Sequence, residues 1–262
     1  MLQRLGAFLL LRHTPGGQRY PEIDALRGLA IGLMVIYHFA FDLTLFGYYQ
    51  ANVFTGVWRI FGRVPAILFL LLVGSSLWLS TARYAARSGR PAPFPRYAGR
   101  GLRILGWGVV ITLVSWAYIG QPVILFGILH LIGTATLLAY PFLKLGMWNV
   151  LIGSLWIALG LALNSVPAAS AALMPLGLHP PDMFQLDYFP VFPWFGVVLL
   201  GIGAAEWLYP GGSRRFDVPP VDAEDRLRPA AALGRRSLLI YLLHQPILFV
   251  ILTLVQHLAN GT

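Results

Sequence analysis

Seven long apolar stretches constrain this chain more than any other feature of its sequence. They cover residues 26–46, 58–80, 100–119, 122–143, 147–164, 189–209 and 236–258. A helix needs about 20 predominantly apolar residues to cross the roughly 30 Å hydrocarbon core of a bilayer. The sequence therefore predicts an all-α, polytopic membrane helix bundle of about seven transmembrane helices, forming a single domain over residues 1–262.

The composition agrees with a lipid environment. Charged residues make up 11% of the chain, whereas soluble proteins carry about 25%. The mean hydropathy is +0.70, and the chain contains 8 tryptophans. Cysteine is absent, which excludes disulfides, a thiolate nucleophile and a cysteine-ligated metal site, and we expect no bound metal.

The positive charges indicate how the bundle is oriented. Connections 47–57, 120–121 and 165–188 hold no lysine or arginine, whereas the others and the N-terminal segment do. By the positive-inside rule, residues 1–25 are a cytoplasmic lead-in, residues 210–235 are a flexible cytoplasmic loop, and the C-terminus lies outside. The cations that mark the inside are Arg4, Arg12, Arg19, Arg83, Arg87, Arg90, Arg96, Lys144, Arg214, Arg215, Arg226, Arg228 and Arg235. The net charge of +9 then reflects topology and anionic lipid, and we expect no nucleic-acid partner.

The first apolar stretch carries a line of polar residues. Arg27, His38 and Asp42 share one helix face, because eleven residues return within 20° of a full rotation and Asp42 follows one turn later. Ionisable residues inside a span are costly and usually functional. A carboxylate one turn from an imidazole can fix its tautomer and make it a better base, so we interpret His38 and Asp42 as a catalytic pair. The alternative is a buried pair that locks helix packing.

Arg59 and Arg63 lie four residues apart at the outer end of the second stretch, against the positive-inside bias. Because Asp42 falls at a similar depth, we expect Arg63 to pair with it. The alternative is that the side chains snorkel to the membrane interface. For Arg59 we favour neither pairing nor snorkelling.

Three more residues predict a pocket on the outer side. His130 lies about 12 Å deep in the fourth stretch, near the level of His38, either in the site or bonded to a neighbouring helix. Asp187 and Trp194 bring a carboxylate and an aromatic face to the outer mouth. Such a combination can hold a sugar, although aromatic residues also gather at membrane interfaces without any such role.

The spacing from Arg27 to His38, within IDALRGLAIGLMVIYH, resembles the arginine–histidine signature of the transmembrane acyltransferase superfamily. More specifically, the chain resembles the bacterial branch of the heparan-α-glucosaminide N-acetyltransferase catalytic family. The similar segments follow the family's order, and they are IDALRGLAIGLMVIYHFAFDL, RVPAILFLLLVGSSLWLS, LFGILHLIGTATLL, DYFPVFPWFGVVLLGIG and SLLIYLLHQPI.

The resemblance implies an enzyme of the bacterial cytoplasmic (inner) membrane that moves an acyl group from cytoplasmic acyl-CoA to an extracytoplasmic sugar or glycan. The donor is acetyl-CoA or another acyl-CoA. His38 would be the base or the acyl carrier, with Asp42 orienting it. The remaining candidate residues are, for the donor, Arg27, Arg100 and Arg103, and, for the acceptor, Arg63, His130, Asp187 and Trp194. The oligomeric state, including a homo-oligomer, stays open.

Two observations limit this interpretation. The lysosomal members of the family have an asparagine at the position of His38 and a histidine shortly after the first span, whereas residues 46–55 here contain none. The lysosomal substrate is therefore not carried over. A proton-coupled transporter that uses His38 and Asp42 as a relay is the alternative function, although the sequence shows no inverted repeat.

Overall fold

The computed structural model describes residues 20–50, 52–53, 55–118, 123–163, 170–178, 180, 187–217 and 222–260. Arg4, Arg12, Arg19 and the side chain of Arg226 lie outside the described residues. The described part is all-α, which confirms the predicted class. Its α-helices are α2 (Pro21–Leu45), α3 (Gly56–Ser88), α4 (Phe94–Tyr118), α5 (Ile128–Phe142), α6 (Trp148–Leu163), α7 (Val191–Leu208), α8 (Asp222–Arg235) and α9 (Ser237–Asn260). Two short 3-10 helices, η1 (Ala171–Leu176) and η2 (Pro210–Gly212), flank α7.

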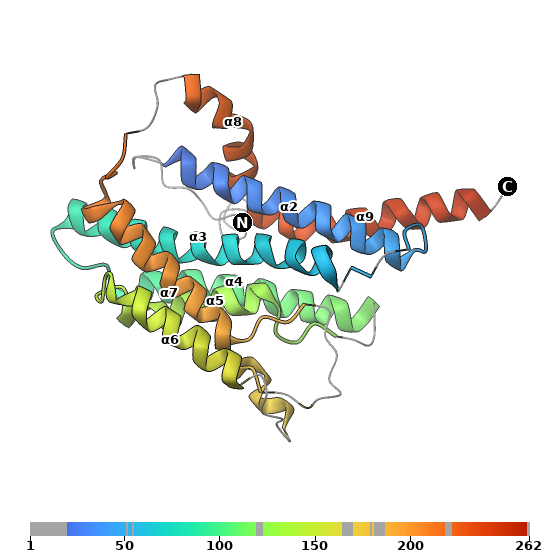
Figure 1. The fold of residues 1–262 in the computed structure, drawn as a ribbon, viewed down its shortest axis with the longest axis horizontal. Helices are drawn as coiled ribbons and strands as arrows, with labels where there is room; N and C mark the ends of the chain where they lie inside the picture. The colour runs from blue at the N-terminus through green and yellow to red at the C-terminus, as the bar shows by residue number, and fades with distance from the viewer. Residues whose placement is uncertain are drawn as a thin grey trace, which may run out of the picture.

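Each of the seven predicted stretches corresponds to one helix, although α2, α3, α4 and α9 extend beyond the predicted bounds. Five of these helices (α2, α3, α4, α7 and α9) are long and apolar enough to cross a membrane, while α5 and α6 are apolar but shorter. The starts of α2, α4 and α6 and the ends of α3, α5 and α7 gather at one end of the bundle, on the left in Figure 1. The chain therefore alternates in direction, as the distribution of arginines predicts, and which end faces the cytoplasm stays a prediction.

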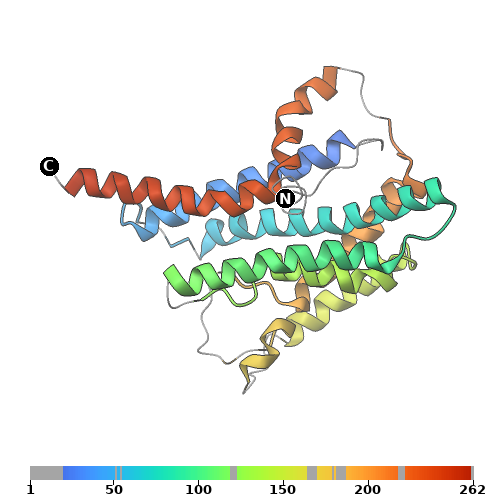
Figure 2. The same ribbon diagram turned by 180° about the vertical axis from the view of Figure 1, so that it is seen from behind.

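The bundle has two parts that share α3. α2 packs on α3 and α9, whereas α7 packs on α3 and α6, and α4 pairs with α5. Figures 1 and 2 show α2 and α9 side by side and running in the same direction, with α9 continuing past the end of α2. Backbones approach closely at Gly74 and Gly201, where an added Cβ would lie 2.0 Å from the Val198 oxygen and 2.1 Å from the Leu71 oxygen. Small residues commonly allow such contacts between membrane helices.

α5 is shorter than predicted because residues 123–127 are not helical. The side chains of α4 satisfy this backbone instead: Thr112 Oγ1 donates to the Ile124 oxygen (2.6 Å) and Ser115 Oγ accepts from the Ile124 N–H (3.1 Å). The Phe126 oxygen accepts from the Phe189 N–H (3.0 Å). Irregular backbone is tolerated within a membrane domain when other protein groups satisfy its hydrogen bonds. Hydropathy does not show where side chains replace the hydrogen bonds of a helix in this way.

The segment 210–235 is not a flexible connector throughout, which corrects the sequence interpretation. Its second half forms α8, which packs across the first turns of α2 (Figure 1). An added Cβ at Gly28 would lie 1.9 Å from the Ala230 oxygen, and one at Gly234 would lie 1.8 Å from the Asp24 oxygen. The proline, glycine and mixed charges of this segment suggested a loop. In the structure Gly234 instead allows the backbones of α8 and α2 to come into contact.

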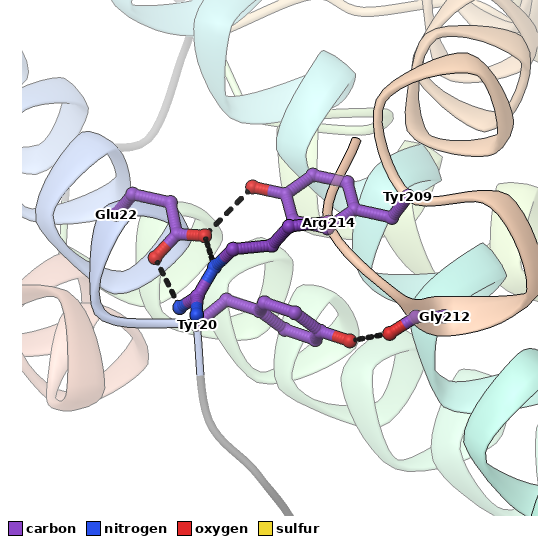
Figure 3. Close-up of polar contacts among 5 residues, drawn as sticks. All are labelled: Tyr20, Glu22, Tyr209, Gly212 and Arg214. Atoms are coloured by element: carbon purple, nitrogen blue, oxygen red, sulfur yellow. Dashed lines mark hydrogen bonds and ion pairs between the residues drawn. The ribbon is translucent and has the colours of Figure 1, made fainter. Parts of the chain in front are cut away.

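The first half of the same segment is tied to the start of α2 by polar contacts (Figure 3). Arg214 donates to both carboxylate oxygens of Glu22, from Nε at 2.8 Å and from Nη2 at 3.0 Å. Tyr209 Oη donates to Glu22 Oε1 (3.0 Å), and Tyr20 Oη donates to the Gly212 oxygen. A bidentate arginine–carboxylate pair has a defined geometry, so these contacts fix the end of α7 against the start of α2.

Candidate functional site

Two side chains of α9 bond to the polar line of α2. His244 Nε2 lies 3.2 Å from His38 Nδ1, and the two rings have centroids 4.9 Å apart. Gln245 Nε2 donates to Asp42 Oδ1 at 2.7 Å. Consecutive residues of α9 thus contact residues one turn apart on α2, which joins the two helices at the level of His38.

The second nitrogen of His244 is also engaged. His244 Nδ1 lies 2.7 Å from the Tyr241 oxygen and 3.2 Å from the Ile240 oxygen, both on the preceding turn of α9. Both ring nitrogens of His244 are therefore held by protein groups. This arrangement fixes the ring against His38.

Asp42 is fully buried and does not bond to His38. Its Oδ2 atom, like Gln245 Oε1, has no hydrogen-bond partner among the described residues. The expected ion pair with Arg63 is not formed: Arg63 is exposed on α3, and the two ion pairs within the described part of the chain are Arg27–Asp24 and Arg214–Glu22. A long arginine side chain reaches the interface at less cost than a buried position, so snorkelling is the better interpretation.

Asp187 lies at the start of α5. Its Oδ2 atom accepts from the Ile128 N–H (3.2 Å) and from Tyr241 Oη (3.3 Å). The N-terminus of a helix favours a carboxylate, because its first N–H groups are free and the helix dipole is positive there. Burial nevertheless raises the pKa of Asp187 to about 6, against the opposing effect of these two hydrogen bonds. Tyr241 therefore links Asp187 to the turn of α9 that holds His244.

His130 is held by its own surroundings. Its Nδ1 atom accepts from the Gly127 N–H (3.2 Å). Since Thr112 Oγ1 donates its own proton to the Ile124 oxygen, it can accept from His130 Nε2 (3.3 Å). With both ring nitrogens bonded, His130 anchors α5 to α4, which agrees with the alternative that this histidine bonds to a neighbouring helix.

Trp194 is partly buried near the start of α7, where its ring lies 4.9 Å from that of Phe189. Phe189 belongs to the extended segment that follows Asp187 and bonds to Phe126. Asp187 and Trp194 are thus close in the chain and belong to the same end of the bundle.

The arginines predicted for the donor lie where α2, α3 and α4 meet. Arg27 donates from Nη1 to Asp24 Oδ1 and from Nη2 to Ser76 Oγ, both at 2.8 Å. Arg100 and Arg103 lie on α4 and are partly buried. Arg100 experiences the positive charges of Arg27 and Arg96, and its buried Nε has no hydrogen-bond partner among the described residues. Three arginines at this end, of which Arg27 is paired with Asp24, are suited to a polyanionic ligand such as a phosphate group.

Three residues of this site, Tyr241, His244 and Gln245, were not assigned a role from the sequence. A signal was present: they are spaced i, i+3 and i+4 in SLLIYLLHQP, so they share one face of an otherwise apolar helix. Among the described residues, no group of three or more histidine, aspartate or glutamate side chains is placed to hold a metal ion.

Comparison with known families gives one match. The model of the heparan-α-glucosaminide N-acetyltransferase catalytic family matches residues 19–246. Searches of curated proteins and of solved structures found no match.

Proposed function

The chain belongs to the heparan-α-glucosaminide N-acetyltransferase catalytic family, and from this we propose that it carries an acetyl group from cytoplasmic acetyl-CoA to an extracytoplasmic acceptor. Family membership implies acetyltransferase activity with acetyl-CoA as the donor, and the helices imply a multi-pass membrane protein. We place it in the bacterial cytoplasmic membrane, with the arginine-bearing ends of the helices inside.

The contact between His38 and His244 is the observation that carries this proposal. His38 lies 17 residues after the start of α2, which is about 26 Å along the helix and about 10 Å from its end. A titratable group at this depth in an apolar helix is costly, and such groups mark functional positions. Its ring is held by a second span, so it has the fixed orientation that a general base requires.

The transfer is written with His38 as the base. His38 removes a proton from an amine or hydroxyl of the acceptor, and the acceptor atom forms a bond to the acetyl carbonyl carbon. The carbon–sulfur bond of the thioester breaks, and the CoA thiolate takes up the proton. In the second route His38 Nε2 attacks the thioester carbonyl carbon and the carbon–sulfur bond breaks, which releases the CoA thiolate. The acceptor then takes the acetyl group from the imidazole, and its proton passes to the thiolate. Asp42, which is buried one turn away and has one free carboxylate oxygen, adds negative charge near the imidazolium.

We assign the donor to the end of the bundle where α2, α3 and α4 meet. Arg27 on α2 lies near enough to Arg100 on α4 for its positive charge to act on it, and Arg103 follows Arg100 on α4. These groups would bind the phosphates of CoA, and the pantetheine arm would bring the thioester toward His38.

We assign the acceptor to the opposite side, beside Asp187 and Trp194. Their carboxylate and aromatic face suit a sugar or glycan. Arg63 is exposed at the outer end of α3 and is available to the same ligand. His130 contributes through the position of α5, because its ring nitrogens are already bonded.

The test is acetyl transfer by purified protein reconstituted in lipid vesicles. Release of CoA can be followed with a thiol reagent, because the chain has no cysteine of its own, and transfer to glucosamine with radiolabelled acetyl-CoA. We expect His38→Ala to lower the rate about 10²–10⁴-fold. His257→Ala is the matched control, because His257 is exposed in the last turn of α9.

Normal acetyl transfer by a folded His38→Ala protein would refute the role of His38. Proton-coupled flux of a solute without CoA release would instead favour the transporter.

A further inference from the structure

The bonds of His244 determine which of its nitrogens carries a proton. Its Nδ1 faces the backbone oxygens of Tyr241 and Ile240, and a carbonyl oxygen can only accept. Nδ1 must therefore be protonated. In the neutral ring this leaves the lone pair on Nε2, the atom that faces His38.

The same reasoning extends to His38. Because His244 Nε2 can only accept in the neutral pair, His38 Nδ1 must donate to it across 3.2 Å. The lone pair of His38 then lies on Nε2. This is the tautomer that presents a basic nitrogen away from α9.

One further acceptor lies near the His38 ring, the backbone oxygen of Met34 on the preceding turn of α2. A carbonyl oxygen can only accept, so like His244 Nε2 it favours a protonated nitrogen on the side of His38 that it faces, and the His244 variants below separate the two contributions. Tyr37 packs edge-on against His38 with ring centroids 5.7 Å apart, and Tyr241 lies 5.8 Å from His244 while its hydroxyl bonds to Asp187. Asp42 is bonded to Gln245. His244 is thus the side chain that bonds to His38 among the described residues.

We propose that His244 is a positioning residue that holds His38 in the tautomer with Nδ1 protonated and Nε2 free to act on substrate. The inference rests on the proposed function, since it names the residue that prepares His38 for that reaction. Asp42 held this orienting role in the interpretation of the sequence, and the geometry points to the partner on α9 instead.

The pair also accommodates the proton during transfer. When His38 Nε2 takes a proton from the acceptor, the ring becomes an imidazolium and its bond to His244 becomes charge-assisted and stronger. The Nδ1 proton can shift to His244 Nε2, so that the positive charge is shared by two rings. When the departing thiolate takes the proton from His38 Nε2, the other proton moves back from His244 Nε2 to His38 Nδ1. Both rings are then neutral again.

Two substitutions at position 244 separate orientation from simple packing. In His244→Gln the amide reaches about as far as Nε2, so its oxygen can accept from His38 Nδ1 although it cannot take up a proton. In His244→Asn the shorter amide reproduces the bond to the Tyr241 oxygen but does not reach His38. We expect His244→Ala and His244→Asn to lower kcat about 10–100-fold with little change in KM, and His244→Gln to recover to within about tenfold of the native chain.

A spectroscopic readout tests the tautomer without reference to activity. Nitrogen-15 spectra of histidine-labelled protein in detergent, assigned with His38→Gln, should show neutral His38 protonated at Nδ1. In free solution the Nε2-protonated form of histidine predominates, so the expected signal is distinctive. His244→Ala should shift His38 toward that solution form, and His257→Ala should leave it unchanged.

Three results would overturn the inference. They are Nε2-protonated His38 in the native chain, an unchanged tautomer in His244→Ala, and native kcat in a folded His244→Ala protein. The proposed function fails differently, through retained activity of His38→Ala. If His38→Ala is inactive while His244→Ala is native in rate and tautomer, the base remains and only the positioning role falls.

Discussion

Replacing Gly28 with alanine should separate α8 from α2. An added Cβ would lie 1.9 Å from the Ala230 oxygen, and relief of this overlap requires a displacement of at least about 1 Å. The obstacle is backbone, so no side-chain rotation removes it. Overpacking of this kind costs about 1–3 kcal/mol, while the change from glycine to alanine within a helix returns about 1 kcal/mol.

Gly32 provides the matched control, because it lies one turn later on α2 and an added Cβ there meets nothing within 4 Å. Both substitutions gain the same helix propensity, so their difference isolates the contact with α8. We expect Gly28→Ala to be about 1–3 kcal/mol less stable than Gly32→Ala, which amounts to several degrees in thermal unfolding in detergent.

A local probe identifies which contact is lost. Ala231 on α8 is 2% exposed, and Ala231→Cys would be the single cysteine of the chain. A maleimide should label this cysteine faster in the Gly28→Ala background than in the Gly32→Ala background. Equal stability and equal labelling in the two backgrounds would refute the packing of α8 on α2.

Three further predictions follow from polar contacts. Burial raises the pKa of Asp187 from 3.8 to about 6, so the folded protein keeps a proton that the unfolded chain has already released. The stability of the fold should therefore fall as the pH rises from about 4 through about 6. In Asp187→Asn this part of the pH dependence should be absent when melting temperatures are compared between pH 4 and 7. Thr112→Val should cost about 1–3 kcal/mol in thermal unfolding, since it leaves His130 Nε2 and the Ile124 oxygen without their partner, and an unchanged melting temperature would contradict these bonds. Arg214→Lys should cost up to about 1 kcal/mol in the same assay, because lysine cannot make the bidentate pair with Glu22, and a stability equal to the native chain would show that the pair contributes nothing.

The helices were predictable because hydropathy and charge report directly on the surrounding lipid. Each apolar stretch corresponds to a helix, and the alternation of arginine-rich connections matches the alternating direction of the chain. The break before α5 was not predictable in this way. Residues 123–127 are apolar like the helical stretches, but their backbone bonds to Thr112 and Ser115 on α4 and to Phe189 before α7, and hydropathy does not report such bonds.

The candidate site was predictable on α2 but not across helices. Helical spacing placed Arg27, His38 and Asp42 on one face, yet it could not say which span faces them. Asp42 was therefore matched with its neighbour His38 and with Arg63, whereas the structure gives it Gln245. The same holds for Tyr241 and His244. Their spacing identifies a polar face of α9, but it does not tell which helix that face contacts.

The position of the donor thioester relative to His38 tests the central claim most directly. A cryo-electron microscopy structure of the protein in lipid, with a stable thioether analogue of acetyl-CoA, would give that distance. We expect the CoA phosphates beside Arg27 and Arg100 and the carbon that stands for the carbonyl carbon within roughly 3–4 Å of His38 Nε2 or of an acceptor atom bonded to it. An analogue bound with its reactive end away from α2 and α9 would contradict the account.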